Sequence, residues 1–367
     1  MSDYSLYLLG LYFLAICAVF LTKFIRGNTG NIFAVAIAFI TFVLAAFRPI
    51  FFPDVDSYEL IFEHAASGAF DDPIYWAAHG EPGFKILSYL LSLTGLGYRG
   101  YLVVWSLVSW LLLLLISRIS SISFAYLWLA YFSFHFITRD LGVIRLGLAS
   151  HLIVIFFIQR AFIWQAVTLF IASLTFQIFA VVAVLARLFS RFKIDWFSIS
   201  LLFLVSFASI KIFNFETLEF LIPEKQAGTY TRSSLSGSGG LSIVVPVVRN
   251  ISVAFFLYYF MRSEIKFRYF RVWIWAVFFS ASFYIMASEI LIVAQRFSAY
   301  FGAIVPLAMA YLMQRRANTQ HTFFLVVLFA LANFAALFYF NDFLWRPELQ
   351  NCYADGLDYR PGLEIGC

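Results

Sequence analysis

Long apolar stretches alternate with short polar segments along the whole chain. Leu, Ile, Val and Phe recur in runs of roughly 15 to 20 residues, long enough for a helix to cross a hydrocarbon core about 30 Å thick. A helix satisfies its own backbone hydrogen bonds in lipid, and the runs lack the alternation of transmembrane barrel strands. The pattern therefore predicts an all-α polytopic integral membrane protein.

The apolar runs divide into about twelve candidate transmembrane helices. They cover residues 4–22, 32–50, 100–117, 122–138, 145–159, 161–175, 177–190, 196–213, 243–261, 271–290, 297–313 and 321–340. The first run lacks the basic start and small-residue cleavage site of a secretory signal, so we expect it to be the first span. We predict a single transmembrane domain over residues 1–367.

Three segments outside these spans are expected at the outer face. Residues 48–99 form a first periplasmic loop, in which the apolar stretch after Pro82 is too short to cross and predicts a helix lying at the interface. Residues 214–242 contain a Gly/Ser-rich stretch typical of a flexible loop. Residues 341–367 form a tail that holds Cys352 and Cys367, and whether these two cysteines pair is left open.

Composition agrees with the hydropathy pattern. Hydrophobic residues make up 63% of the chain and charged residues 12%, whereas a soluble domain carries about 25% charged residues. The formal net charge of +5 does not indicate nucleic-acid binding, because the basic residues cluster between spans as in cytoplasmic loops. These clusters contain Lys23, Arg26, Arg187, Arg191, Lys193, Arg262, Lys266, Arg268, Arg271, Arg315 and Arg316.

The acidic residues have the opposite distribution. Of the 20 acidic residues, Asp195 and Glu264 alone fall in predicted cytoplasmic loops. The first outward loop holds Asp54, Asp56, Glu59, Glu63, Asp71, Asp72 and Glu81. We therefore expect any chemistry at the outer face.

Four arginines stand at predicted outer ends of spans, where the positive-inside rule does not require them. They are Arg48, Arg139, Arg145 and Arg296. An arginine in the bilayer costs at least about 2.5 kcal/mol on insertion scales, so it usually faces a cavity or a partner. Guanidinium groups bind phosphate oxygens in a bidentate manner, which would suit a lipid diphosphate. Snorkelling near a helix end is the alternative for any single arginine.

Candidate catalytic carboxylates lie in the same loop. Asp54 and Asp56 follow Arg48 closely, and Glu81 precedes the Pro-Gly that begins the predicted interfacial helix. A positioned carboxylate can take the proton of an acceptor hydroxyl. Glu81 could instead cap the helix, so the identity of the base stays open.

Other chemical signatures are missing from the sequence. The five histidines show no metal-ligand spacing, and there is no nucleophile elbow or P-loop. No metal or cofactor is expected. His135 and His151 are interpreted as packing or substrate-contact residues. Tyr58 could stack on a sugar ring or anchor the chain at the interface.

The order of several short motifs resembles the EpsG-like branch of Wzy-type polysaccharide polymerases. The motifs are Phe47-Arg48, Asp54-x-x-x-Tyr58-x-x-x-Phe62, Glu81-Pro82-Gly83-Phe84, Arg145-x-x-x-Ala149 and Arg296-Phe297-x-x-Tyr300. The resemblance extends from about Phe47 to Tyr311. Where that family often has a histidine, this chain has Gln177, which can donate a hydrogen bond but has no acid–base role.

The resemblance implies a glycosyltransferase of the bacterial inner membrane that polymerises O-antigen or capsule repeat units at the periplasmic face. Its substrates would be undecaprenyl-diphosphate-linked oligosaccharide and polysaccharide within the membrane lipid, and its partners a chain-length regulator and a flippase. The four arginines would bind the diphosphates, and Asp54, Asp56 or Glu81 would activate the acceptor hydroxyl. Tyr58, Gln177 and Tyr300 would contact the glycan.

Two alternatives remain. The first is another polyprenyl-dependent glycosyltransferase or an O-antigen ligase, which would share the outward site and the lipid donor. The second is a flippase or transporter of lipid-linked sugars. A flippase should carry charged residues deep in several spans, whereas here most charges gather at span ends.

Overall fold

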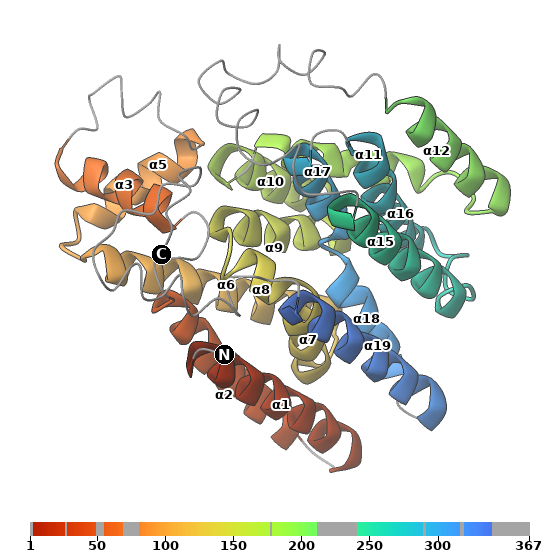
Figure 1. The fold of residues 1–367 in the computed structure, drawn as a ribbon, viewed down its shortest axis with the longest axis horizontal. Helices are drawn as coiled ribbons and strands as arrows, with labels where there is room; N and C mark the ends of the chain where they lie inside the picture. Colours follow the sequence, from red (N-terminus) through yellow and green to blue (C-terminus); the bar gives the residue numbers. More distant parts are fainter. Residues whose placement is uncertain are drawn as a thin grey trace. The chain divides into compact units, whose positions relative to one another are not determined.

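The computed structural model describes residues 3–25, 28–48, 55–68, 81–176, 178–210, 241–288, 291–315 and 319–339. All regular structure in these ranges is helical (Figure 1), which confirms the predicted all-α class. Residues 214–240 of the predicted flexible loop and the tail at 341–367 lie outside the described residues.

Helix covers most of the described part of every predicted span. Among the described residues, six helices are long and apolar enough to cross a membrane: Tyr4–Phe24, Thr29–Ala46, Tyr98–Ser120, Arg268–Met286, Ala294–Arg315 and Gln320–Tyr339. The other apolar helices are shorter, with 10–17 residues. The chain is therefore a multi-pass membrane protein, and the count of about twelve crossings stays a prediction.

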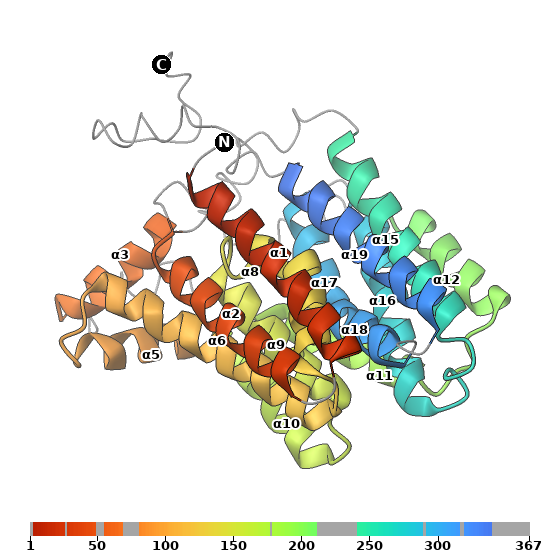
Figure 2. The ribbon, with the colours of Figure 1, turned by 90° about the horizontal axis from the view of Figure 1, so that it is seen from below.

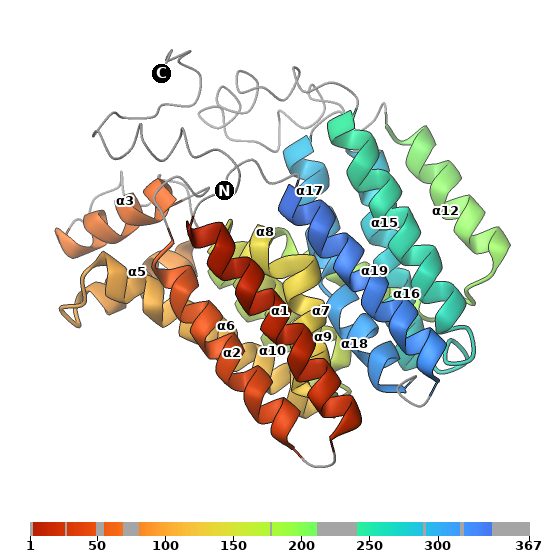
Figure 3. The same cartoon turned by 60° about the horizontal axis from the view of Figure 1, so that its bottom comes forward.

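The chain divides into two compact units, Met1–Ile178 with Pro306–Asp358, and Phe179–Val305. In the first unit, the helices are α1 (Asp3–Phe24), α2 (Thr29–Ala46), α3 (Val55–Ala66), α5 (Pro82–Ser92), α6 (Tyr98–Ser120), α7 (Phe124–Tyr131), η2 (Phe132–Phe136), α8 (Ile137–Arg139), α9 (Ile144–Ile158), α10 (Phe162–Ile171), η3 (Ala172–Phe176), α18 (Val305–Arg315, all but its first residue) and α19 (Gln320–Tyr339). Figures 2 and 3 show α1 beside α2, and these two helices are in contact. η2 and η3 are π-helical, a distortion that is frequent at functional sites.

The core of the first unit lies around η2 and α9. Almost every residue of α9 is buried, as expected for a helix that is apolar on all sides. On α1, the Tyr12 hydroxyl is 2.9 Å from Ser133 Oγ of η2, and its ring stacks on Phe334 of α19. The Asn333 side chain donates to the Ser133 carbonyl at 2.5 Å. These polar contacts fix three helices that are far apart in sequence.

The predicted first outward loop contains a helix, α3, that the pattern of long apolar runs does not predict. Helix α3 buries Tyr58, Ile61, Phe62 and Ala65, which are spaced i, i+3, i+4 and i+7 on one helical face. The acidic residues between them obscured this periodicity. α3 packs against α5 (Figure 1), the helix predicted from Pro82. The placement of α5 at the membrane interface remains a prediction.

The second unit contains η4 (Ile178–Ala183, all but its first residue), α11 (Val184–Phe189), α12 (Trp196–Ala208), α15 (Leu241–Phe260), α16 (Arg268–Met286) and α17 (Leu291–Gly302). α16 is largely buried and contacts α11, α12, α15 and α17. Large apolar side chains such as Phe197 and Leu204 of α12 are exposed, as expected of a lipid-facing helix.

Candidate functional site

A tight turn between α8 and α9 brings two of the predicted arginines to one place. Arg139 is the last residue of α8, Arg145 lies in the first turn of α9, and both are buried. Gly142 occupies the turn because a Cβ there would lie 2.6 Å from the Thr138 carbonyl oxygen. The two arginines therefore flank a turn that contains glycine.

Arg145 forms an ion pair with Glu81, a residue 64 positions earlier. Its Nη1 donates to Glu81 Oε2 at 2.6 Å, and the side chains are 2% and 15% exposed. The Arg145 guanidinium also lies over the rings of Tyr58, at 5.8 Å, and Phe84, at 5.6 Å. The charge is therefore enclosed by a carboxylate on one side and aromatic faces on the others.

Glu81 reaches Arg145 because of how α5 begins. Glu81 is the N-cap residue of α5, with Pro82 at the first helical position. Glu81 thus occupies the N-cap position that the sequence offers as an alternative role, but its side chain makes no capping hydrogen bond. A Cβ on Gly83 would lie 2.8 Å from the Thr175 Cα, so only glycine allows α5 to approach η3 this closely.

Arg48 joins the same turn from the end of α2. Its side chain is fully buried, and Nη1 donates to the Asp140 carbonyl at 2.8 Å. The Arg48 carbonyl in turn accepts from Arg99 Nη1 at 3.2 Å. Among the described atoms, Arg48 Nε and Nη2 have no hydrogen-bond partner. A buried guanidinium with unused donors is costly unless a ligand completes it.

Sequence reasoning missed Asp140, which lies between Arg139 and Arg145 in the chain. The Tyr131 hydroxyl donates to the Asp140 carboxylate, and the side chain of Asp140 is buried. The signal available in the sequence was its position directly after Arg139. A buried carboxylate beside arginines supplies counter-charge to the site.

His151 is also part of this environment. The ring lies 4.9 Å from that of Tyr131, and Nδ1 is 2.8 Å from the Gly147 carbonyl oxygen. Since a carbonyl only accepts, Nδ1 carries the proton and Nε2 is left as an acceptor, which has no partner among the described atoms. This agrees with the interpretation of His151 as a packing or substrate-contact residue, without deciding between the two.

Lys85 is a second residue that sequence reasoning missed. It lies one turn into α5 and is 1% exposed. Burial is the main factor that lowers the pKa of Lys85, and the positive charge of Arg145 lowers it further, while Glu81 acts in the opposite direction. Lys85 is the one basic residue of the apolar stretch from Pro82 to Leu96, and that isolation was the signal.

The site thus gathers more positive than negative charge. Within the described part of the chain, four buried basic side chains (Arg48, Lys85, Arg139 and Arg145) lie at or near the α8–α9 turn with two acidic ones (Glu81 and Asp140), and the exposed Arg99 contacts the Arg48 carbonyl. Buried charges require partners. An excess of buried guanidinium groups is the arrangement that binds phosphate oxygens.

The remaining predicted residues are placed less fully. Asp54 and Gln177 lie outside the described residues, and Asp56 lies on α3 with its side chain undescribed. Arg296 and Tyr300 are on α17 in the second unit, where Arg296 is partly exposed and Tyr300 is fully buried. In the first unit Tyr58 is fully buried and its hydroxyl accepts from the Arg145 backbone N–H at 3.4 Å. In this conformation it supports Arg145 rather than offering a free ring face.

The helices and the buried, arginine-rich site place this chain in the class of helical multi-pass membrane proteins. Residues 31–350 match the family model described as EpsG family, and the chain belongs to the EpsG family. This confirms the resemblance and indicates a membrane protein of the polysaccharide-polymerase type. No match was found among the curated proteins or among the solved structures.

Proposed function

We propose that this protein is a membrane glycosyltransferase that polymerises repeat units carried on undecaprenyl diphosphate, at the periplasmic face of the bacterial inner membrane. The observation that carries the proposal is the buried excess of positive charge at the α8–α9 turn, with Arg145 bound to Glu81 at 2.6 Å. An anion-binding site would also suit a ligase or a transporter of lipid-linked sugars, and membership of the EpsG family favours a polymerase over these functions.

The chemistry assigned to the site is a substitution at the anomeric carbon of the donor glycan. The acceptor hydroxyl attacks that carbon, the bond to the diphosphate oxygen breaks, and the hydroxyl proton passes to a carboxylate. The leaving diphosphate gains negative charge as the bond breaks. Arg48, Arg139 and Arg145 would stabilise that charge more in the transition state than in the ground state, which is the source of rate.

Glu81 is the favoured base of the three predicted carboxylates, because it is placed next to a buried arginine. A diphosphate that binds Arg145 would compete with Glu81 for the guanidinium and release its carboxylate to accept the proton. Diphosphate binding and base activation would then be coupled. Asp54 and Asp56 remain candidates for the same role, and Arg296, Gln177 and Tyr300 for substrate contacts.

The test is the length distribution of surface polysaccharide with and without this gene, complemented by wild type and by Arg145→Ala at equal protein level. The proposal expects single lipid-linked repeats in the null strain and long chains only with wild type. Long chains from Arg145→Ala would remove the role of Arg145. Transport of lipid-linked oligosaccharide between leaflets by purified protein, without chain growth, would establish the flippase alternative.

A further inference from the structure

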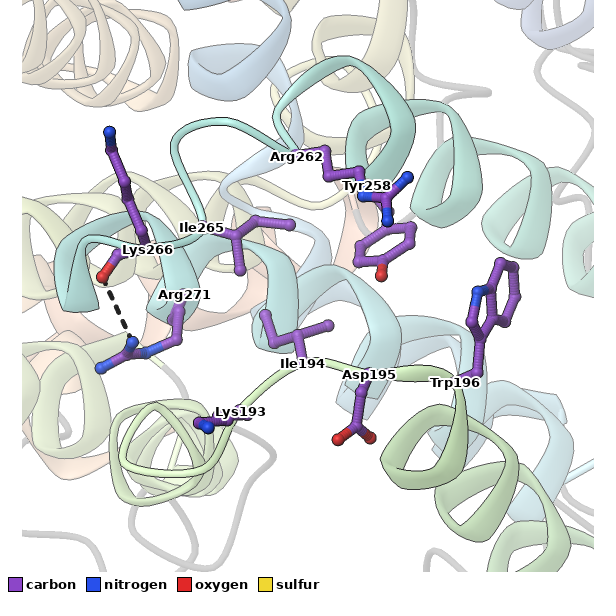
Figure 4. Close-up of a pocket in the computed structure, with 9 residues that line it drawn as sticks. All are labelled: Lys193, Ile194, Asp195, Trp196, Tyr258, Arg262, Ile265, Lys266 and Arg271. Carbon is purple, nitrogen blue, oxygen red and sulfur yellow. Dashed lines mark hydrogen bonds between the residues drawn. The ribbon is translucent and has the colours of Figure 1, made fainter.

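A basic pocket opens in the second unit, away from the α8–α9 turn in sequence and built from other helices. Its volume is about 440 Å³, and it lies where α12 and α16 begin and α15 ends (Figure 4). Helix ends in a multi-pass protein lie near the membrane surface, and this is the side on which the basic residues predict cytoplasm.

Four cations line the pocket, and they come from three segments. Lys193 precedes α12, Arg262 and Lys266 follow α15, and Arg271 lies in the first turn of α16. None of these four side chains forms an ion pair with another described residue. Their charge is therefore available to a ligand.

The pocket's acidic residue, Asp195, offsets at most one of the four positive charges. Its carboxylate accepts from the Ser198 backbone N–H at 2.8 Å and so caps α12. Hydrogen bonding with the Ser198 backbone and side chain, and to a smaller degree the charge of Lys193, keep the pKa of Asp195 below its usual value. The carboxylate is already engaged by the helix that it caps.

Arg271 is held in place without a counter-charge. Its Nε donates to the Ser190 carbonyl at 2.9 Å, and its Nη1 donates to the Lys266 carbonyl at 3.3 Å. Figure 4 shows Lys193 on the same side of the pocket as Arg271, and Arg262 beside Tyr258 on the other. The positive-inside rule accounts for basic residues in cytoplasmic loops. It does not require a guanidinium that two backbone carbonyls orient at the edge of a pocket.

The rest of the lining is apolar and borders on lipid-facing surface. Ile194 and Ile265 are largely buried, whereas Trp196 is 63% exposed. Phe197 and Tyr259, which follow Trp196 and Tyr258 in the chain, are also exposed. Exposed aromatic residues at helix ends are typical of the membrane–water interface.

We propose that this pocket binds the phosphate headgroup of an anionic phospholipid. The four cations supply the charge for the phosphate, and the isoleucines and Trp196 supply contacts for the glycerol and upper acyl region. Basic pockets between transmembrane helices are suited to such headgroups. The pocket is lined by other residues than those of the proposed polymerase site, and the proposal does not depend on that site.

The test measures lipid binding by the purified full-length chain in neutral detergent, using native mass spectrometry with short-chain phosphatidylglycerol, phosphatidylcholine and inorganic phosphate as probes. Wild type should retain phosphatidylglycerol in preference to phosphatidylcholine. The double variant Arg262→Gln/Lys266→Gln should bind phosphatidylglycerol about fivefold more weakly for each charge removed.

The matched control is Arg118→Gln/Arg315→Gln, which removes two charges at the ends of other helices, α6 and α18. It should bind as wild type does. If phosphatidylglycerol binding falls equally in the control and pocket variants, or does not fall in the pocket variant, the proposed site is wrong. Inorganic phosphate that binds as tightly as phosphatidylglycerol would overturn the lipid as its ligand. Elution volume and thermal unfolding of each variant check that the fold is intact.

Discussion

Glu81 and Arg145 meet at 2.6 Å although 64 residues separate them in the chain. Glu81 is the N-cap residue of α5, and Arg145 lies in the first turn of α9. A carboxylate and a buried guanidinium in direct contact can serve as a resting state, in which the carboxylate takes the place that a substrate anion would occupy.

Arg145→Ala should reduce polymerisation about 100- to 1,000-fold, as is typical when one donor to a developing anion is lost. The reason is that the diphosphate leaving group loses a buried guanidinium. Chain length on the cell surface and turnover by membranes supplied with lipid-linked repeats are the measurements. Arg160→Ala, at an exposed arginine beyond α9, is the control and should behave as wild type.

Glu81→Gln should separate binding from chemistry. The amide keeps the size of the side chain but is uncharged, so it competes less strongly for Arg145 and cannot act as a base. The substrate should therefore bind more tightly while kcat falls about 100- to 10,000-fold. Steady-state kinetics with a lipid-diphosphate acceptor would give both parameters. If kcat is retained and only KM changes, Glu81 is a partner of Arg145 and the base is another carboxylate.

Gly83→Ala should destabilise the protein by about 1–3 kcal/mol, the usual range for an overpacked contact. The new Cβ would lie 2.8 Å from the Thr175 Cα, so α5 must move away from η3 and take Glu81 with it. Denaturation in detergent gives the stability. Gly97→Ala is a matched control, because Gly97 has φ −72° and no atom within 4 Å of the added Cβ. Equal effects at both positions would contradict the packing argument.

Tyr131→Phe should cost about 1–3 kcal/mol, since it removes the hydroxyl that donates to the buried Asp140 carboxylate. Activity should fall as well, because Asp140 also accepts from Arg48 through its carbonyl at 2.8 Å. Tyr126→Phe, on the same helix and also buried, controls for loss of a tyrosine hydroxyl. A double-mutant cycle of Tyr131→Phe with Asp140→Asn should show that the two changes are not additive.

The candidate site was predictable in part. The sequence singles out Arg48, Arg139 and Arg145 because a charge beside a long apolar run is conspicuous and costly. It singles out Glu81 because this residue precedes the Pro-Gly that begins a helix. Lys85 and Asp140 were missed, since one looked like a surface lysine and the other like a turn residue until packing enclosed them. Helix α3 was missed because acidic residues stand between the apolar positions of its buried face, and that face becomes evident only from its contact with α5.

The sequence by itself determined the membrane class, the helical fold and the location of charged residues at span ends. These properties follow from the lipid environment, which requires long apolar runs and backbones whose hydrogen bonds are satisfied within a helix. The apolar runs can be recognised in the linear sequence. Only the tertiary structure decided that Glu81, rather than another acid among the described residues, pairs with Arg145, and that Arg48 reaches the Asp140 carbonyl across 92 residues. Such pairings depend on the close approach of α5 to η3 and on the turn at Gly142, where fractions of an ångström decide which charges meet.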